Sequence, residues 1–212
     1  MDINRDVLLA ELENCKSVFN MAKLPTWDEM PKLELYMDQV VVLLNDYLGY
    51  VSKINPFEKS VTSSMINNYV KMKIIPAPRK KKYSRIHLSR LIVICSLKRS
   101  INISDICKML PECDDEAENK RVYDAFVKSR SEAIDNNIVN IEHEFKCAVE
   151  SCDVTEISNM ISRSAVVADL NKMFAEKFTN LIYETDEKQS KKSDKDKAEK
   201  KAEKKDKNKK ED

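Results

Sequence analysis

A run of cations in the middle of the sequence has the composition of a phosphate-binding segment. The run and its flanking residues comprise Arg79, Lys80, Lys81, Lys82, Tyr83 and Arg85. Four adjacent positive charges repel one another, and the release of counterions from nucleic-acid phosphates is a natural compensation for holding them on a short turn. We therefore expect residues 79–85 to contact a phosphate backbone.

A second group of polar side chains lies upstream, where a helix is predicted over about residues 62–73. The candidate contact residues there are Thr62, Ser63, Ser64, Asn67, Asn68 and Lys71. At 100° per residue the last four share one face, whereas the opposite face comprises Met65, Ile66, Tyr69, Val70 and Met72. Serine, asparagine and lysine side chains can reach base edges and phosphates in a DNA major groove. The alternative is a helix face that is merely solvated.

The charge distribution favours a polyanion partner for this region. The whole chain carries a net charge of +1, but residues 58–110 contain twelve basic and two acidic side chains. Residues 1–57 and 111–183 are acidic, with net charges of −4 and −7, and residues 184–212 carry +2. A strongly basic segment between acidic ones is typical of a nucleic-acid-binding site. A basic face without a ligand is the alternative.

Helices and a turn must position these groups. Apolar residues at helical spacing predict a helix over residues 6–21 and another over 33–48, which Gly49 would end as a C′ glycine. Pro76 and Pro78 bar a helix, so the cationic run is predicted to form a small β-hairpin, or wing.

Two further helices are predicted after the wing. The first spans residues 87–98 with Ser84 as a cap, and the second spans 101–110 with Ser104 as a cap. The resulting order is helix, helix, wing, helix, helix, and it is predicted to form a unit of residues 31–111.

The residues of this unit match a family pattern. A helix opens after a valine and a small polar residue, ends at an isoleucine before a proline, and is followed by a wing with a tyrosine; the positions are Val61, Thr62, Ile75, Pro76 and Tyr83. This pattern resembles the MerR-type winged helix-turn-helix. The resemblance implies a DNA-reading helix at about 62–73, phosphate contacts from Arg79, Lys81 and Tyr83, and double-stranded DNA as the partner.

The chain departs from the MerR-type pattern at several positions. Recognition helices of that family usually carry arginine and tyrosine where this chain has Asn67 and Asn68. The family has glycine after the recognition helix and before the fourth helix, where this chain has Lys73 and Asn102. The whole chain is also similar to a family of short bacterial proteins, suggested as transcriptional regulators, that is catalogued as a domain of unknown function.

The C-terminal half is predicted to form a helical hairpin. Apolar stripes run over residues 115–152 and again from Thr155, and such a hairpin cannot bury both stripes by itself. By analogy with MerR-type proteins we expect a homodimer that binds a two-fold related site. His143, Cys147 and Cys152 could form a metal or thiol cluster, but we expect them to be ordinary helix-interface residues.

Four segments are therefore expected in a mainly α protein. They are an accessory helix with a tryptophan-containing loop (1–30), a winged helix-turn-helix (31–111), a helical hairpin for dimerisation or effector response (112–184) and a charged tail (185–212). The tail is expected to be disordered, or else a fraying helix.

Several function classes are disfavoured by composition. The chain has a single glycine, so glycine-rich phosphate-binding loops are absent, and no carboxylate pair or nucleophile motif suggests an enzyme, a cofactor or a metal site. Without a long apolar segment or a secretory start, we expect a cytoplasmic protein with reduced cysteines. The sequence favours a DNA-binding transcriptional regulator with an unknown effector. A protein-interaction adaptor or an architectural nucleic-acid-binding module is the alternative.

Overall fold

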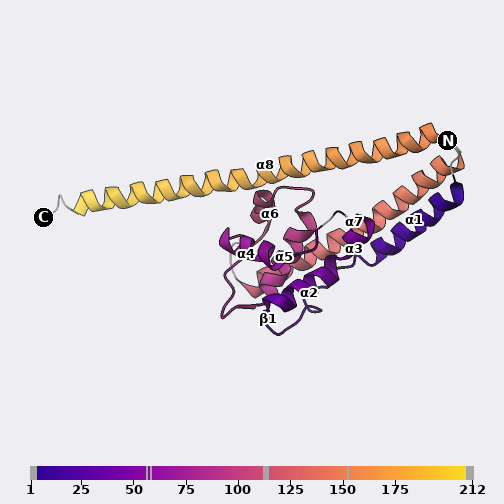
Figure 1. Cartoon of the computed structure of the whole chain (residues 1–212). Coiled ribbons are helices and arrows are strands. Elements are labelled where there is room, and N and C mark those ends of the chain that lie inside the picture. The colour runs from indigo at the N-terminus through magenta and orange to yellow at the C-terminus, as the bar shows by residue number, and fades with distance from the viewer. Residues whose placement is uncertain (1–3, 56, 58, 112–114, 152, 209–212) are drawn as a thin grey trace.

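The protein is mainly α-helical in a computed structural model, with one small antiparallel sheet (Figure 1). The structure describes residues 4–55, 57, 59–111, 115–151 and 153–208, with side chains up to residue 183. The elements in chain order are α1 (Arg5–Asn20), β1 (Leu35–Tyr36), α2 (Met37–Leu48), α3 (Tyr50–Ile54), α4 (Ser63–Lys71), β2 (Lys82–Tyr83), α5 (Arg85–Leu97), α6 (Ile103–Met109), α7 (Glu116–Glu150) and α8 (Val154–Asn208).

Helix α5 lies at the centre of the hydrophobic core. Every residue from His87 to Cys95 is buried, as is expected for a helix that is surrounded by other elements. Helices α2, α6 and α7 and strand β2 all contact it. At its start, the Ser84 backbone N–H donates to His87 Nδ1 at 3.1 Å, which closes a capping box.

The core extends beyond residues 31–111 on both sides. Trp27 is 2% exposed, and its ring meets Tyr123 of α7 edge-to-face with 6.3 Å between the centroids. The Trp27 backbone N–H donates to Asp124 Oδ1 at 2.8 Å, and the Tyr123 hydroxyl donates to the Pro25 carbonyl at 2.8 Å. The expected boundaries at 31 and 111 therefore cut through one continuous core.

The two strands differ in their pairing from the expected hairpin. β2 pairs with β1, in the register Leu35 with Tyr83 and Tyr36 with Lys82. Leu35 and Tyr36 were expected at the start of a helix, but they are extended, and α2 begins at Met37. Strand β1 thus supplies the backbone hydrogen-bond partners of β2. Within residues 79–85 themselves, the pairing is a single bridge between Arg79 and Lys82.

Two predicted helix ends also differ. Gly49 has a right-handed φ of −66°, so it is not a left-handed C′ glycine, and α3 follows at once within the loop before α4. A Cβ on Gly49 would lie 2.5 Å from the Asn45 carbonyl oxygen, which explains the glycine by close approach. The N-cap position of α6 is Asn102, whereas Ser104 lies inside the helix.

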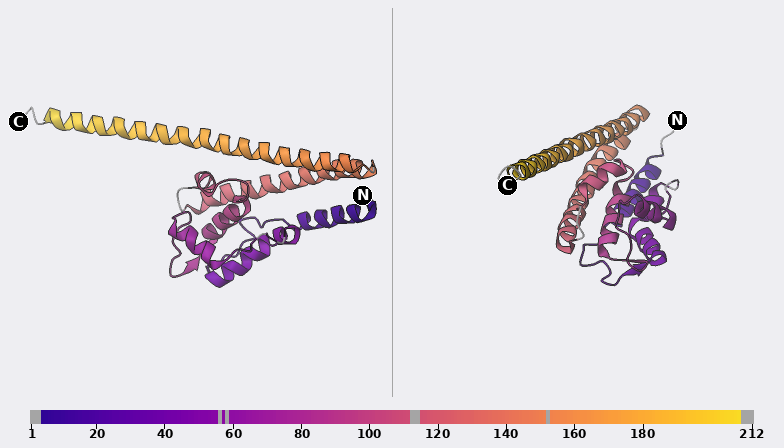
Figure 2. Two further views of the ribbon diagram at one scale, coloured as in Figure 1. Left: turned by 45° about the horizontal axis from the view of Figure 1, so that its top comes forward. Right: turned by 90° about the vertical axis from the view of Figure 1, so that its left-hand side faces the viewer.

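Helices α7 and α8 are consecutive and turn back on each other, as the predicted hairpin requires (Figure 2). α1 packs along α7, and α8 passes α6 before it continues beyond the rest of the molecule. For the tail from residue 185, disorder or a fraying helix was expected; α8 runs through Asn208, and lysine, glutamate and alanine are good helix formers. Among the helices described, none has both the length and the apolar character needed to cross a membrane.

Candidate nucleic-acid interface

Helix α4 exposes the polar face that its sequence predicts. Thr62 caps it, and the Met65 backbone N–H donates to Thr62 Oγ1 at 3.3 Å. The exposed residues are Thr62, Ser63, Ser64, Asn67, Asn68, Lys71 and Met72. Ile66 and Tyr69 are buried, and burial raises the pKa of Tyr69 to about 12. Met72 was expected on the buried face, but it is 58% exposed because it already lies past the last helical turn.

The start of α4 is tied to α2 by a single side chain. The Val61 backbone N–H donates to Asn45 Oδ1 at 2.8 Å, and Asn45 Nδ2 donates to the Val61 carbonyl at 2.9 Å. An amide side chain that satisfies both groups of one residue mimics a strand partner. It fixes the backbone immediately before the cap, and thereby the place where the polar face begins.

The end of α4 carries a lysine in a conformation that favours glycine. Lys73 has a φ of 59°, and its N–H donates to the Val70 carbonyl at 3.0 Å. The Ile74 N–H donates to the Tyr69 carbonyl at 2.9 Å. These two bonds and the left-handed residue form a Schellman motif, in which glycine is the usual C′ residue.

The cationic run forms a tight turn that holds its charges outward. The Lys82 N–H donates to the Arg79 carbonyl at 3.0 Å, and Lys80 and Lys81 have φ values of 51° and 62°. Two successive left-handed residues are typical of a type I′ turn, where asparagine and glycine are preferred. The side chains of Arg79, Lys80 and Lys81 are exposed, and Lys82 Nζ lies 5.5 Å from the Tyr36 ring centroid.

Two residues of the expected phosphate-contact group are structural instead. Tyr83 is 3% exposed because its strand position points into the core, where its ring meets His87 edge-to-face. Arg85 Nη2 pairs with Glu116 Oε1 at 3.1 Å, and its guanidinium lies 5.5 Å from the Trp27 ring centroid. The exposed cations of the turn are thus Arg79, Lys80 and Lys81, with Lys82 partly exposed.

Most cations of the basic segment form no ion pair within the part of the chain that the structure describes. Among the twelve basic residues of 58–110, Arg85 and Lys108 pair with carboxylates, and Arg90 is buried against the Pro111 carbonyl and Asn119. For the other nine, no ion pair with a described residue is found. Uncompensated cations of this density raise the local concentration of anions.

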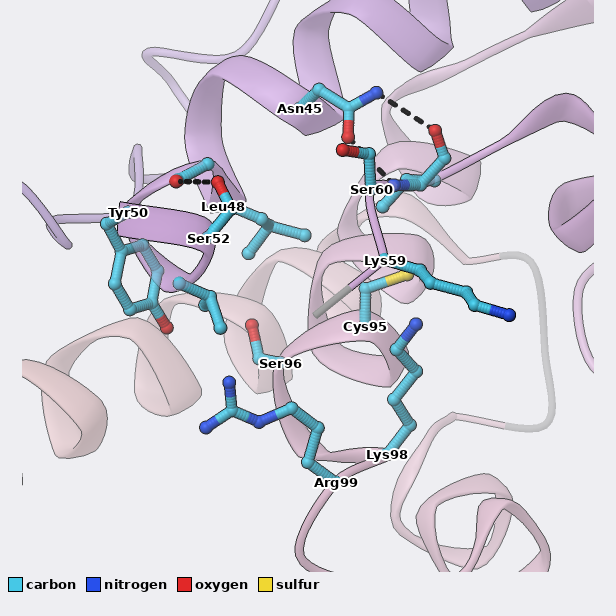
Figure 3. Close-up of a pocket in the computed structure, with 13 residues that line it drawn as sticks. Asn45, Leu48, Tyr50, Ser52, Lys59, Ser60, Cys95, Ser96, Lys98 and Arg99 are labelled. Carbon is cyan, nitrogen blue, oxygen red and sulfur yellow. Dashed lines mark hydrogen bonds between the residues drawn. The ribbon is translucent and has the colours of Figure 1, made fainter. Parts of the chain in front are cut away.

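Three other cations of the basic segment, to which the sequence assigned no role, lie around a cavity. Lys59, Lys98 and Arg99 surround a small cavity at the end of α5, next to the Asn45–Val61 contact (Figure 3). Their positions come together only through the packing of α2, α3 and α5, so no local pattern indicated the cavity.

The possible metal or thiol cluster on the C-terminal helices receives no support among the described residues. No group of three histidine, cysteine or carboxylate side chains suited to a metal ion is found there. Cys147 is exposed, whereas Cys152 lies outside the described residues.

Comparison with known proteins gives a match to one family model over part of the chain. Residues 25–126 match the family model described as a domain of unknown function, DUF1836. The matched range is slightly less than half of the chain, and it coincides with the core from Leu24 to Tyr123 and Phe126. No curated protein and no solved structure matches the chain. The matched family and the hydrophobic core therefore delimit the same unit.

Proposed function

We propose that the protein is a sequence-specific DNA-binding transcriptional regulator. The observation that carries the proposal is the combination of the exposed polar face of α4 with the exposed cations Arg79, Lys80 and Lys81 of the turn. In this proposal α4 enters the major groove and the turn lies on the phosphate backbone. α4 lies on the side of the compact helical core that is away from the N-terminus (Figure 1).

The order of the elements supports a winged helix-turn-helix of the MerR type. α2, α4, α5 and α6 follow in the order that the resemblance implies, with the turn before β2 at the position of the wing; β1 and α3 are additions to that order. Lys73 supports the same alignment, because it adopts the left-handed conformation at a position where the MerR-type pattern has glycine.

The side chains of α4 suit both base and phosphate contacts. Asn67 and Asn68 offer paired donor and acceptor groups, which match the edge of adenine in the major groove. Ser63, Ser64 and Lys71 suit hydrogen bonds to phosphates at the two ends of the helix. The proposal therefore assigns sequence preference to Asn67 and Asn68 and general affinity to the lysines.

Left-handed lysines in the turn also support an ionic role. A residue with a side chain costs about 1–2 kcal/mol in this conformation, and asparagine or glycine would avoid much of that cost. Lys80 and Lys81 occupy the two positions where the type I′ turn prefers those residues. Strain of this kind is a reason to look for a ligand of the two charges.

We further propose that two copies of the chain dimerise through α8. Met160, Val167, Phe174 and Leu181 recur every seven residues, the spacing of helices that pair along a seam. The last three are 51%, 60% and 52% exposed, and the rings of Phe174 and Phe178 stack with 6.1 Å between centroids. A second copy offers the same stripe, and a two-fold dimer would place two α4 helices on a two-fold related site.

A gel-shift titration with fragments of the source genome tests the regulatory function. A regulator should bind fragments that contain its site at least about 1,000-fold more tightly than random DNA at the same salt concentration. Equal binding to all fragments would favour an architectural module. No binding to any fragment would favour an adaptor that uses the apolar face of α8 for another protein.

A further inference from the structure

A small cavity lies beside the start of α4. It has a volume of about 140 Å³ and is formed where the end of α2, helix α3, residues 59–61 and the end of α5 meet. A water molecule occupies about 30 Å³ of liquid, so the cavity has room for a few waters or for one small oxyanion. Its size excludes a drug-sized apolar ligand.

The charges around the cavity have one sign. Lys59, Lys98 and Arg99 line it, and no acidic side chain is found among its described lining residues. Figure 3 shows Lys98 and Arg99 reaching back along α5 toward Cys95 and Ser96, whereas Lys59 extends outward. The dipole of α5 favours cations near its last turn, but it does not explain why two long side chains turn back to the same cavity.

Hydroxyl groups complete the lining. Ser96 Oγ is a buried atom without a hydrogen-bond partner in the described structure, and Ser60 lines the same cavity. Leaving a buried hydroxyl without a hydrogen-bond partner is unfavourable, and an acceptor in the cavity would remove that cost. Ser89, about two turns earlier in α5, instead donates its hydroxyl to the Ile86 carbonyl at 3.0 Å. The unpaired Ser96 is therefore not a general property of serines in α5.

We propose that this cavity binds a phosphate-sized oxyanion, free or carried by a small molecule, and that the bound anion acts on α4. Lys98 and Arg99 supply the charge, and Ser96 supplies a hydroxyl donor. The connection to α4 is short, because Ser60 precedes Val61, which Asn45 holds at the start of the helix. The anion site stands on its own geometry, whereas its effect on α4 rests on the proposed DNA binding.

Isothermal titration of the full-length protein with inorganic phosphate tests the site without DNA. Ionic strength is kept constant with sodium chloride, and the variants are Lys98→Gln with Arg99→Gln, Ser96→Ala, and Lys128→Gln as a control on α7. Each lost charged hydrogen bond is expected to weaken binding by about tenfold or more. The double variant, which lacks two cations, should lose about a hundredfold in affinity, Ser96→Ala should lose several-fold, and the control should bind as the original protein does. Absence of phosphate binding, or equal binding by the double variant, would overturn the site.

A second experiment measures DNA affinity as a function of phosphate concentration. It tests whether an anion in the cavity changes DNA binding through α4, and whether that anion is a free one or a phosphate of the DNA. If the cavity is an effector site, DNA affinity changes and then reaches a plateau once the cavity is saturated, and the double variant loses the change. An affinity that falls without limit would mean that phosphate competes with DNA for the cavity, which would overturn the effector role. An unchanged DNA affinity would overturn the coupling. Should the protein bind no DNA, the titration above would still decide the anion site.

Discussion

Asn45 uses both ends of its side-chain amide on the backbone of Val61, at 2.8 Å and 2.9 Å. The pair joins α2 to the residue just before the cap of α4, over a separation of sixteen residues. It therefore connects the packed core, the cavity beside Ser60 and the proposed DNA-reading face. An isolated helix of nine residues is marginal in water, so we expect the position of that face to depend on this contact.

Replacing Asn45 by alanine should destabilise the protein by about 1–3 kcal/mol, because a partly buried N–H and C=O lose their partners. Urea unfolding monitored by circular dichroism measures the change. Asn14→Ala removes an exposed asparagine on α1 and serves as the matched control, with a change within about 0.5 kcal/mol. Equal stability of the two variants would show that the Asn45 contact does not hold α4.

Trp27 should contribute to stability as a core residue of the same unit. Trp27→Ala removes a side chain that is 2% exposed, and such changes cost about 3–5 kcal/mol. Phe57→Ala, at a position that is 92% exposed, should change the free energy of unfolding by less than about 0.5 kcal/mol. Thermal unfolding of both variants provides the comparison. A small effect at Trp27 would mean that the N-terminal segment is not part of the core.

Lys73→Gly should stabilise the protein by about 1 kcal/mol, because glycine adopts the left-handed conformation at no steric cost. Lys73→Ala removes the same charge but keeps the strain, so it should give no gain. Denaturant midpoints of the two variants separate the conformational effect from the electrostatic one. An equal gain in stability in both variants would mean that the loss of the charge, and not the backbone conformation, causes it.

The thiol of Cys95 should resist alkylation at pH 8, whereas the exposed Cys147 should react. Burial raises the pKa of Cys95 to about 11, so its reactive thiolate is scarce at that pH. A pKa raised in the folded state also means that the stability which Cys95 contributes is complete below pH 9 and is lost as the pH rises toward 11. Mass spectrometry of the native protein after iodoacetamide treatment checks the reactivity. Rapid labelling of Cys95 would contradict its burial.

Sedimentation equilibrium at micromolar concentration tests the proposed dimer. The original protein should be dimeric, and Phe174→Glu with Leu181→Glu should be monomeric because charges would then face each other across the seam. Val42→Glu changes an exposed apolar residue of α2, which is 71% exposed, and should leave the dimer intact. A monomeric original protein would rule out α8 as the dimer interface under these conditions.

Local patterns predicted most of the helices and the polar face of α4. Thr62 and Ser84 occupy N-cap positions, and the period of 3.6 residues placed Ile66 and Tyr69 inside and Asn67 and Asn68 outside. These features depend on residues within one or two turns, so a single sequence contains the necessary information.

Contacts between distant segments were not predictable in the same way. The pairing of Leu35 with Tyr83 turned an expected helix start into a strand and placed the tyrosine in the core. The contact between Trp27 and Tyr123 extended the unit beyond its expected boundaries, and the cavity at Ser96 exists only through packing. Charge counting identified the basic segment, but it could not separate Arg85, which pairs with Glu116, from the exposed Lys80 and Lys81 of the turn.

The salt dependence of DNA binding tests the central proposal most directly. Affinity for a duplex is measured by fluorescence anisotropy over a range of salt concentrations, for the original protein and for the variant with Lys80, Lys81 and Lys82 changed to alanine. Changing Lys128, Lys172 and Lys177 of α7 and α8 to alanine removes the same charge elsewhere. The turn variant should lower the slope of log affinity against log salt by about one for each lost phosphate contact, and the control should not. An unchanged slope in the turn variant would contradict a role of the turn in binding DNA.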